Sequence, residues 1–190
     1  MKILSSFLLM TLIGIFSGCG TTQYSTDDDK IFIWAKDKAI VWTDFRGSIP
    51  AEDANVKWSA VTFSFIAYRI VDKNKTLIGA YFDRSQSWVI RQRDDLLKHE
   101  QYHFNITEIF ARQIREKVTK NKLLPGSPSF DYVYSMEIAK CNTMQKEYDD
   151  ATEHGKNKEE QLRQEKLIDE KLTALDAFKD PMAIYASKEY

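Results

Sequence analysis

The chain has 190 residues, and after an N-terminal targeting segment about 165 remain, enough for one domain with a hydrophobic core. Hydrophobic residues make up 43% of the chain and charged residues 29%, a composition typical of soluble globular proteins. The formal net charge of −1 argues against the basic surface that nucleic-acid binding requires, so we expect no nucleic-acid partner.

Residues 1–18 have the pattern of a signal peptide. The positive start Met1-Lys2 precedes an apolar stretch that is too short to span a membrane comfortably. Ser17-Gly18-Cys19 resembles the lipobox of bacterial lipoproteins, in which the cysteine is acylated, although Phe16 stands where leucine is commonest. Acyl chains anchor a protein stably to a membrane, and the polar residues 19–30 are expected to form a flexible tether. We therefore expect a lipid-anchored protein of the bacterial cell envelope; secretion with a free Cys19 is the alternative.

Residues 31–190 are predicted to form a single domain in which strands come first. Short apolar stretches over 31–41 indicate a small hairpin. The β-branched and aromatic residues of 56–71 predict a strand, which a turn at 73–75 joins to a partner strand over 76–82. A third short strand is expected at 87–91.

Helices are predicted for the second half of the chain. After Arg93, apolar residues recur at three- and four-residue intervals, which predicts a helix from Asp94 or Asp95 to about Thr119. Two further helices are expected over 131–151 and 159–177, with Cys141 as a lone buried thiol. Strands followed by helices predict an α+β fold with a small, mainly antiparallel sheet.

The first predicted helix contains the sequence His99-Glu100-Gln101-Tyr102-His103. On a helix, His99 and His103 project from the same face one turn apart, so their rings can hold one Zn²⁺ ion. Glu100 projects about 100° away, where it can take a proton from a zinc-activated water and deliver it to a leaving amine. This is the HExxH arrangement of zinc peptidases, and it predicts a metallohydrolase with a peptide or protein substrate. The alternative is two histidines on an ordinary amphipathic helix.

A catalytic zinc ion usually has three protein ligands and one water molecule. The remaining histidine, His154, is the first candidate for the third ligand; otherwise it is a cation that favours a helix C-terminus. Glu137 or Glu147 on the second predicted helix, or an aspartate, are the alternatives. Asp149 or Asp150 is expected to accept a hydrogen bond from the second ring nitrogen of a ligand.

Several segments together resemble the DUF922 family, which is described as predicted secreted zinc-dependent proteases of bacteria. The similarity extends over about residues 33–172 and rests on Trp42-Thr43-Asp44-Phe45-Arg46-Gly47, Ala60-Val61-Thr62, Ser87-Trp88-Val89, Leu96 to Phe104, and Tyr148-Asp149 with Thr152, His154 and Gly155. The resemblance implies a zincin-like fold in which the metal helix packs under a small sheet. It supports His154 as a ligand, with Tyr148 and Asp149 beside it. Gln161 matches a glutamine of the family, whereas a tryptophan common just after it is absent.

Three functions are consistent with these features. The first is a membrane-anchored peptidase, whose extended substrate pairs with a sheet edge within residues 60–69. The second is a zinc amidase acting on cell-wall peptides. The third is a lipoprotein scaffold that binds zinc without turnover. Glu100 favours the enzymes, because a purely structural zinc site does not need this glutamate.

Overall fold

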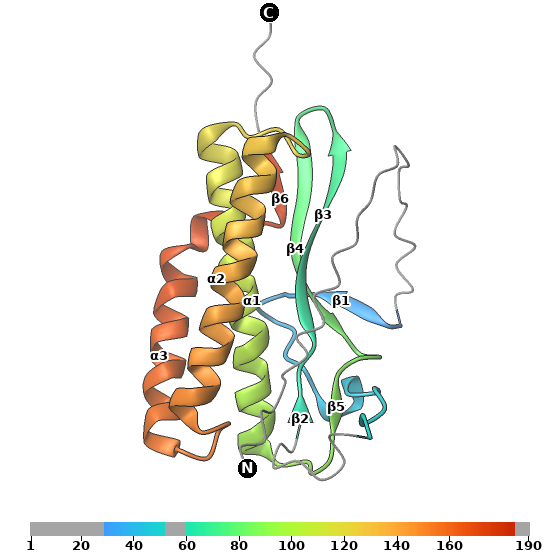
Figure 1. Ribbon diagram of the computed structural model, residues 1–190, viewed down its shortest axis with the longest axis vertical. Helices are drawn as coiled ribbons and strands as arrows, with labels where there is room; N and C mark the ends of the chain where they lie inside the picture. Colours follow the sequence, from blue (N-terminus) through green and yellow to red (C-terminus); the bar gives the residue numbers. More distant parts are fainter. Residues whose placement is uncertain (1–28, 52–59, 185–190) are drawn as a thin grey trace, which may run out of the picture.

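The computed structural model describes residues 29–51 and 60–184 (Figure 1). The predicted signal peptide, the lipidation site Cys19 and the tether up to residue 28 lie outside the described residues, as does the start of the strand predicted over 56–71. Within the described residues, no helix is long and apolar enough to cross a membrane.

An antiparallel sheet forms one layer of the fold (Figure 1). β3 (Ser64–Asp72) and β4 (Lys75–Asp83) form a hairpin. β1 (Ile31–Ile33) and β6 (Met182–Ile184) pair with opposite ends of β4 on its other edge, so β3 is an outer strand of the described sheet. β2 (Ala60–Val61) and β5 (Trp88–Val89) form a separate antiparallel pair.

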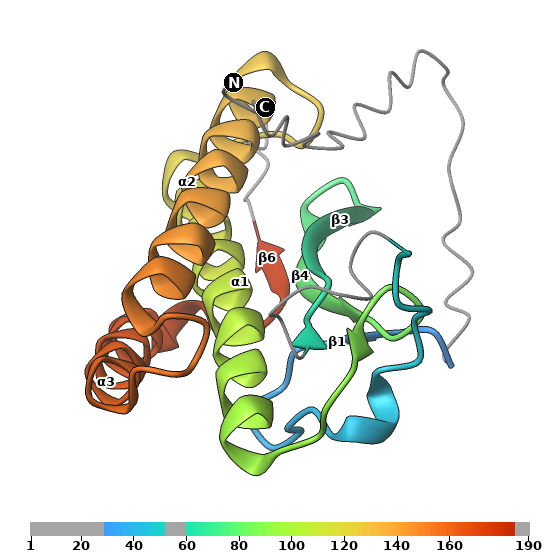
Figure 2. The same ribbon diagram turned by 60° about the horizontal axis from the view of Figure 1, so that its bottom comes forward.

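Three helices form the second layer: α1 (Asp94–Asn121), α2 (Pro128–Thr152) and α3 (Lys158–Ala174). α1 lies between the sheet and the other two helices and contacts all of them (Figure 2). For this reason α1 buries side chains around most of its circumference, whereas α2 and α3 bury few. The hydrophobic core cluster includes Ile78, Phe82, Phe104, Ile106, Ile109, Phe130 and Ile168.

The predicted α+β class is confirmed, because a small antiparallel sheet is joined to three helices. The strand predicted over 56–71 is interrupted at Thr62 and Phe63, which corrects its course. The backbone N–H of Phe63 donates to Ser87 Oγ at 2.9 Å, and its carbonyl accepts from Asp83 at 2.9 Å, so the chain leaves one strand pair and enters the other. α2 begins at Pro128 rather than 131, since Ser127 Oγ accepts from the N–H of Phe130 and caps the helix.

Two further observations concern a strand near the C-terminus and the cysteine of α2. β6 was not predicted, because three residues after a helix carry no periodic signal; they form a strand by pairing with the start of β4. Cys141 is a free, buried thiol, as expected. Burial raises its pKa to about 12, which makes it unreactive.

Candidate metal centre

The two histidines of the motif meet one carboxylate from α2. His99 Nε2 and His103 Nε2 lie 3.1 Å apart on α1, and each lies 3.1 Å from Oδ1 of Asp149. These three atoms therefore form a nearly equilateral triangle. Within residues 29–51 and 60–184, His99, His103 and Asp149 are also the group of histidine, cysteine and acidic side chains that is close enough to share one metal ion.

The packing of α2 on α1 builds this triangle. The end of α2 lies beside the start of α1, because the helices run in opposite directions (Figure 1). The ring of Tyr148 stacks on His99 with ring centroids 4.7 Å apart and meets the edge of His103 at 5.0 Å. Tyr148 is 2% exposed, so its burial fixes the height at which the next residue, Asp149, faces the histidines.

Glutamine amides hold the other nitrogen of each ring. His99 Nδ1 lies 3.0 Å from Oε1 of Gln161 on α3, and His103 Nδ1 lies 2.6 Å from Oε1 of Gln145 on α2. Gln145 Nε2 donates to the carbonyl of His103 at 2.9 Å, which fixes the direction of that amide. Because an amide oxygen only accepts hydrogen bonds, both Nδ1 atoms carry a proton, so each ring in its neutral form presents the lone pair of Nε2 to the triangle.

With both rings neutral, this arrangement brings together two nitrogen lone pairs and an anionic oxygen, which repel one another unless a proton or a metal cation joins them. Ligand atoms of a tetrahedral zinc ion stand about 3.3–3.4 Å apart, given metal–ligand distances of about 2.0–2.1 Å. The observed separations of 3.1 Å are close to that value. The donor set and its spacing therefore fit a small divalent metal ion.

The shifted pKa values of Asp149 and His103 also indicate a site that attracts a cation. Burial raises the pKa of Asp149, but hydrogen bonds and charge from His103 and His99 outweigh it and hold the pKa well below its usual range. Burial lowers the pKa of His103, but Asp149, through a hydrogen bond and its charge, raises it to about 9. The metal-free site thus holds a proton that balances the carboxylate, and a metal cation can replace it.

Glu100 lies beside the triangle without joining it. Its side chain is buried, with 3% of the residue exposed, and its charge contributes to the raised pKa of His103. Thr62 Oγ1 donates to the backbone carbonyl of Glu100 at 3.3 Å, which places the link between β2 and β3 over this turn of α1. A carboxylate near the ligands but outside the metal group has the placement of a general base.

His154, the first candidate for the third ligand, lies at the edge of the site. Its Nδ1 is 3.2 Å from the same Oδ1 of Asp149, and it is not a member of the group of three. Glu153, His154 and Gly155 all have positive φ angles, 51°, 54° and 75°, so three successive residues are left-handed. Such a run is costly for two non-glycine residues and turns the chain back over His99.

The other residues predicted for the site, Asp149, Glu137 and Glu147, differ in their position relative to the triangle. Asp149, expected to orient a ring, contacts Nδ1 of His154 but also faces both Nε2 atoms as a potential ligand. Glu137, an alternative ligand, is buried and paired with Lys117 at 2.6 Å and Lys140 at 2.8 Å. Glu147 is exposed and is not in the group of three.

Sequence reasoning missed the two glutamines that orient the rings. The sequence indicates Gln161 only through its match to a glutamine of the DUF922 family, and no pattern in the sequence points to Gln145. Gln145 occurs four residues before Asp149 on α2, and this spacing places both side chains on the helix face that contacts α1.

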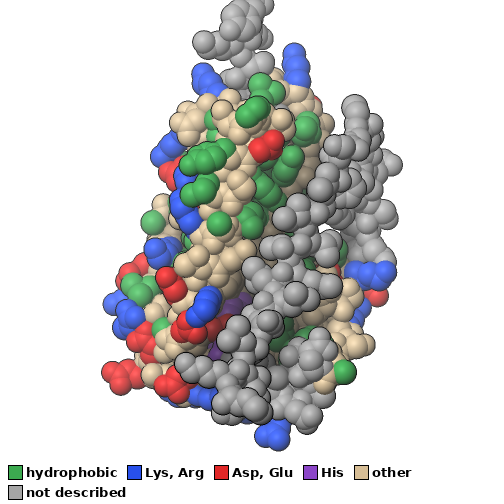
Figure 3. Space-filling model, viewed as in Figure 1, with side chains coloured by type: hydrophobic (Ala, Val, Ile, Leu, Met, Phe, Trp, Pro, Cys, Tyr) green, Lys and Arg blue, Asp and Glu red, His purple; other side chains and the backbone are tan. Residues whose placement is uncertain are grey.

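The site is open to solvent. Asp149 and His154 have side chains that are 29% and 32% exposed, and that of His103 is 13% exposed. Histidine atoms are visible at the surface beside acidic and basic side chains (Figure 3). The edge of the triangle formed by His103 and Asp149 is therefore accessible from solvent.

Comparison with known proteins adds no assignment: no family model, no curated protein and no solved structure matches this chain. The function is accordingly argued from the site itself.

Proposed function

We propose that this chain is a zinc-dependent hydrolase of peptide bonds, in which His99, His103 and Asp149 hold the metal and Glu100 is the general base. The observation that supports it most strongly is the triangle of two Nε2 atoms and one Oδ1 at 3.1 Å, with both Nδ1 atoms held by amide oxygens. An ordinary helix has no need of two rings oriented in this way.

Zinc is the metal we propose on the chemistry of the donors. Two imidazoles and one carboxylate are a ligand set of catalytic zinc sites, and they leave a fourth position for water. When bound, zinc lowers the pKa of a water molecule and polarises the substrate carbonyl. Glu100 would accept a proton from a water molecule held there and return it to the leaving amine. Asp149, whose pKa is held low, keeps its charge throughout.

His154 has two possible roles under this proposal. In one, it is a further ligand beside Asp149, from whose Oδ1 its Nδ1 lies 3.2 Å. In the other, it only donates a hydrogen bond to Asp149. Loss of zinc on His154→Ala supports the first role, and retained zinc supports the second.

An extended peptide is the proposed substrate, and β3 is the strand with which it would pair. β3 is the outer strand of the described sheet, and its start is joined to α1 by a 2.7 Å hydrogen bond between Ser64 Oγ and Thr107 Oγ1. Further along, the carbonyl of Ile66 accepts from the hydroxyl of Tyr134 at 2.6 Å, which occupies one position of the edge. We therefore expect pairing before Ile66, next to the segment that lies over Glu100.

The N-terminal sequence indicates where in the cell this activity would take place. A signal peptide followed by a lipobox-like Cys19 suits an exported protein anchored to a bacterial membrane. Peptides of the cell wall are present there, so a zinc amidase acting on them is the second candidate. The resemblance to the DUF922 family agrees with either enzyme.

The test compares the full chain with its Glu100→Gln variant and with Glu147→Gln, a matched control on an exposed glutamate of α2. Zinc content is measured by elemental analysis, and cleavage is measured on casein and on peptidoglycan peptides. We expect stoichiometric zinc in all three proteins and loss of cleavage only in Glu100→Gln. Zinc in all three without cleavage by any of them would favour the scaffold, and absence of zinc from the unaltered chain would refute the metal site.

A further inference from the structure

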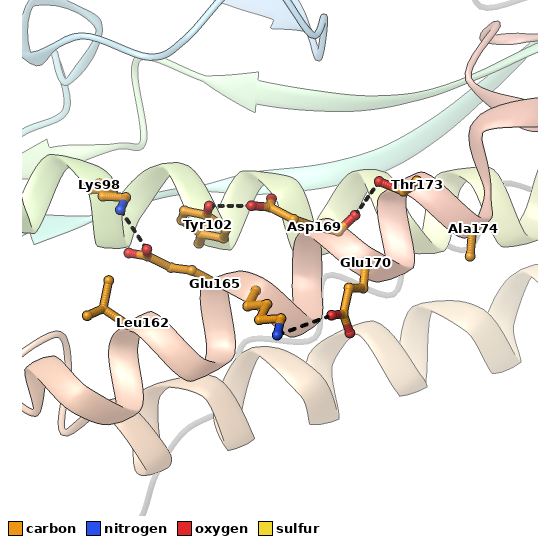
Figure 4. Close-up of a pocket in the computed structure, with 9 residues that line it drawn as sticks. Lys98, Tyr102, Leu162, Glu165, Asp169, Glu170, Thr173 and Ala174 are labelled. Atoms are coloured by element: carbon orange, nitrogen blue, oxygen red, sulfur yellow. Dashed lines mark hydrogen bonds and ion pairs between the residues drawn. The ribbon is translucent and has the colours of Figure 1, made fainter.

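The hydrogen bonds that orient His99 continue outward to a surface groove between α1 and α3. Gln161, whose Oε1 faces His99 Nδ1, donates from Nε2 to Oε1 of Glu165 at 3.0 Å. The other oxygen of Glu165 is 2.6 Å from Nζ of Lys98. Figure 4 shows this pair at one end of the groove, with Glu165 extending from α3 toward Lys98 on α1. Glu165 and Gln161 are each 5% exposed, so both lie within the packed helices.

Glu165 decides which way the amide of Gln161 points. A carboxylate only accepts hydrogen bonds, so Nε2 of Gln161 has to face it and Oε1 has to face His99. Tyr148 constrains the direction more weakly: its hydroxyl accepts from the same Nε2 at 2.5 Å while donating a long bond of 3.4 Å to the carbonyl of His99, and a hydroxyl can donate as well as accept. If the amide turned over, its oxygen would oppose the carboxylate at hydrogen-bond distance, and its NH₂ would demand a bare Nδ1 on His99.

The direction of this amide matters at the triangle. With Oε1 facing it, Nδ1 of His99 carries a proton and Nε2 presents its lone pair to His103 and Asp149. With the amide reversed, the proton of the neutral ring would lie on Nε2 and block the metal position. We propose that Glu165 is a positioning residue of the metal centre, which acts through Gln161 to select the nitrogen that His99 offers to the metal. This inference rests on the proposed metal site.

Glu165→Gln is the informative substitution. Lys98 attracts the amide oxygen of the new side chain, which leaves its NH₂ toward Gln161 and favours reversal of that amide. We expect zinc affinity, measured by competition with a chelator, to fall about tenfold, as for other partners of metal-bound histidines. Asp169→Asn is the matched control: Asp169 lies in the same groove and bonds Tyr102 rather than Gln161, and the change removes the same charge. We expect less than about a twofold effect there, since solvent screens its charge.

A double-mutant cycle with Gln161→Leu separates positioning from a direct effect of charge. Gln161→Leu alone is expected to cost about 10–100-fold in zinc affinity. If Glu165 acts through Gln161, adding Glu165→Gln to that variant costs nothing more. An equal loss in both backgrounds would overturn the proposal, because it would show that the charge of Glu165 acts directly on the metal.

A second measurement needs no metal. The full chain has three histidines, so the ring nitrogens of His99 can be assigned in long-range proton–nitrogen NMR spectra with single substitutions. We expect a protonated Nδ1 on His99 in the unaltered metal-free chain and in Asp169→Asn, and an unprotonated Nδ1 in a large fraction of Glu165→Gln. A protonated Nδ1 in all three refutes the role of Glu165, whether or not the chain binds zinc. The expected spectra in a chain that binds no zinc would refute only the metal site.

Discussion

Replacing Gly155 by alanine tests the packing of the turn against His99, a proposed metal ligand. The φ angle of Gly155 is +75°, and an added Cβ would lie 3.2 Å from both Cβ and Cγ of His99. The left-handed backbone alone costs an alanine roughly 1–2 kcal/mol. The His99 ring stacks on Tyr148 and cannot move away from the added Cβ, so crowding adds about 1–3 kcal/mol to this cost. The unfolding free energy should therefore fall by about 2–5 kcal/mol, and zinc affinity should fall with it, because His99 has to move.

Gly126→Ala is the control for the backbone cost. Gly126 has a φ of +81°, but nothing lies within 4 Å of an added Cβ. This change should lower the melting temperature by about 2–8 °C, at roughly 2–4 °C per kcal/mol for a chain of this size, and leave zinc affinity unchanged. Melting is followed by circular dichroism and zinc affinity by chelator competition. Equal melting temperatures for the two variants, with unaltered zinc affinity in Gly155→Ala, would show that the turn does not press on His99.

Three other predictions concern charged groups. Glu108→Ala leaves two buried arginines without their shared carboxylate, so urea unfolding should show a loss of about 3–5 kcal/mol; an ordinary loss below 1 kcal/mol would contradict this. Glu137→Gln should leave zinc affinity unchanged, because this carboxylate pairs with lysines; a loss of zinc would restore it as a ligand. Since Asp149 raises the pKa of His103 from 6.5 to about 9 against the effect of burial, protonation stabilises the metal-free chain fully below pH 6.5, and this stability is lost as the pH rises through 9. Urea titrations from pH 6 to 10 should show that decline, and His103→Gln should remove it.

Much of the fold could be predicted because it depends on local periodicity. The helix of the motif has apolar side chains at three- and four-residue intervals, and its predicted range differs from Asp94–Asn121 by about two residues at its end. The hairpin of β3 and β4 was predicted from β-branched residues around a polar turn. The break at Phe63 and the strand at Met182–Ile184 could not be predicted, because each depends on a partner distant in the sequence.

For the site too, features that depend on local spacing could be predicted, and features that depend on the packing of distant segments could not. The spacing of His99 and His103 follows from one helical turn, so these residues could be placed on one face from the sequence. The carboxylate that completes the triangle depends on the height at which α2 packs against α1, and no local pattern gives that height. Asp149 was therefore expected beside the site rather than in it, and whether His154 binds the metal stays a prediction.

A motif of two histidines determines where the two rings lie along the helix, but not which nitrogen of each ring faces the triangle. That choice is made by Gln145, 42 residues after His103, and by Gln161, 62 residues after His99. Each of these glutamines belongs to a different helix, so the proposed metal site is a property of the packed three-helix layer. Ile168, fully buried on α3 two turns after Gln161, holds that helix against the core. A cavity made there by Ile168→Ala loosens α3, and for this reason it should weaken zinc binding as well as stability, although Ile168 is not among the residues that contact the metal triangle.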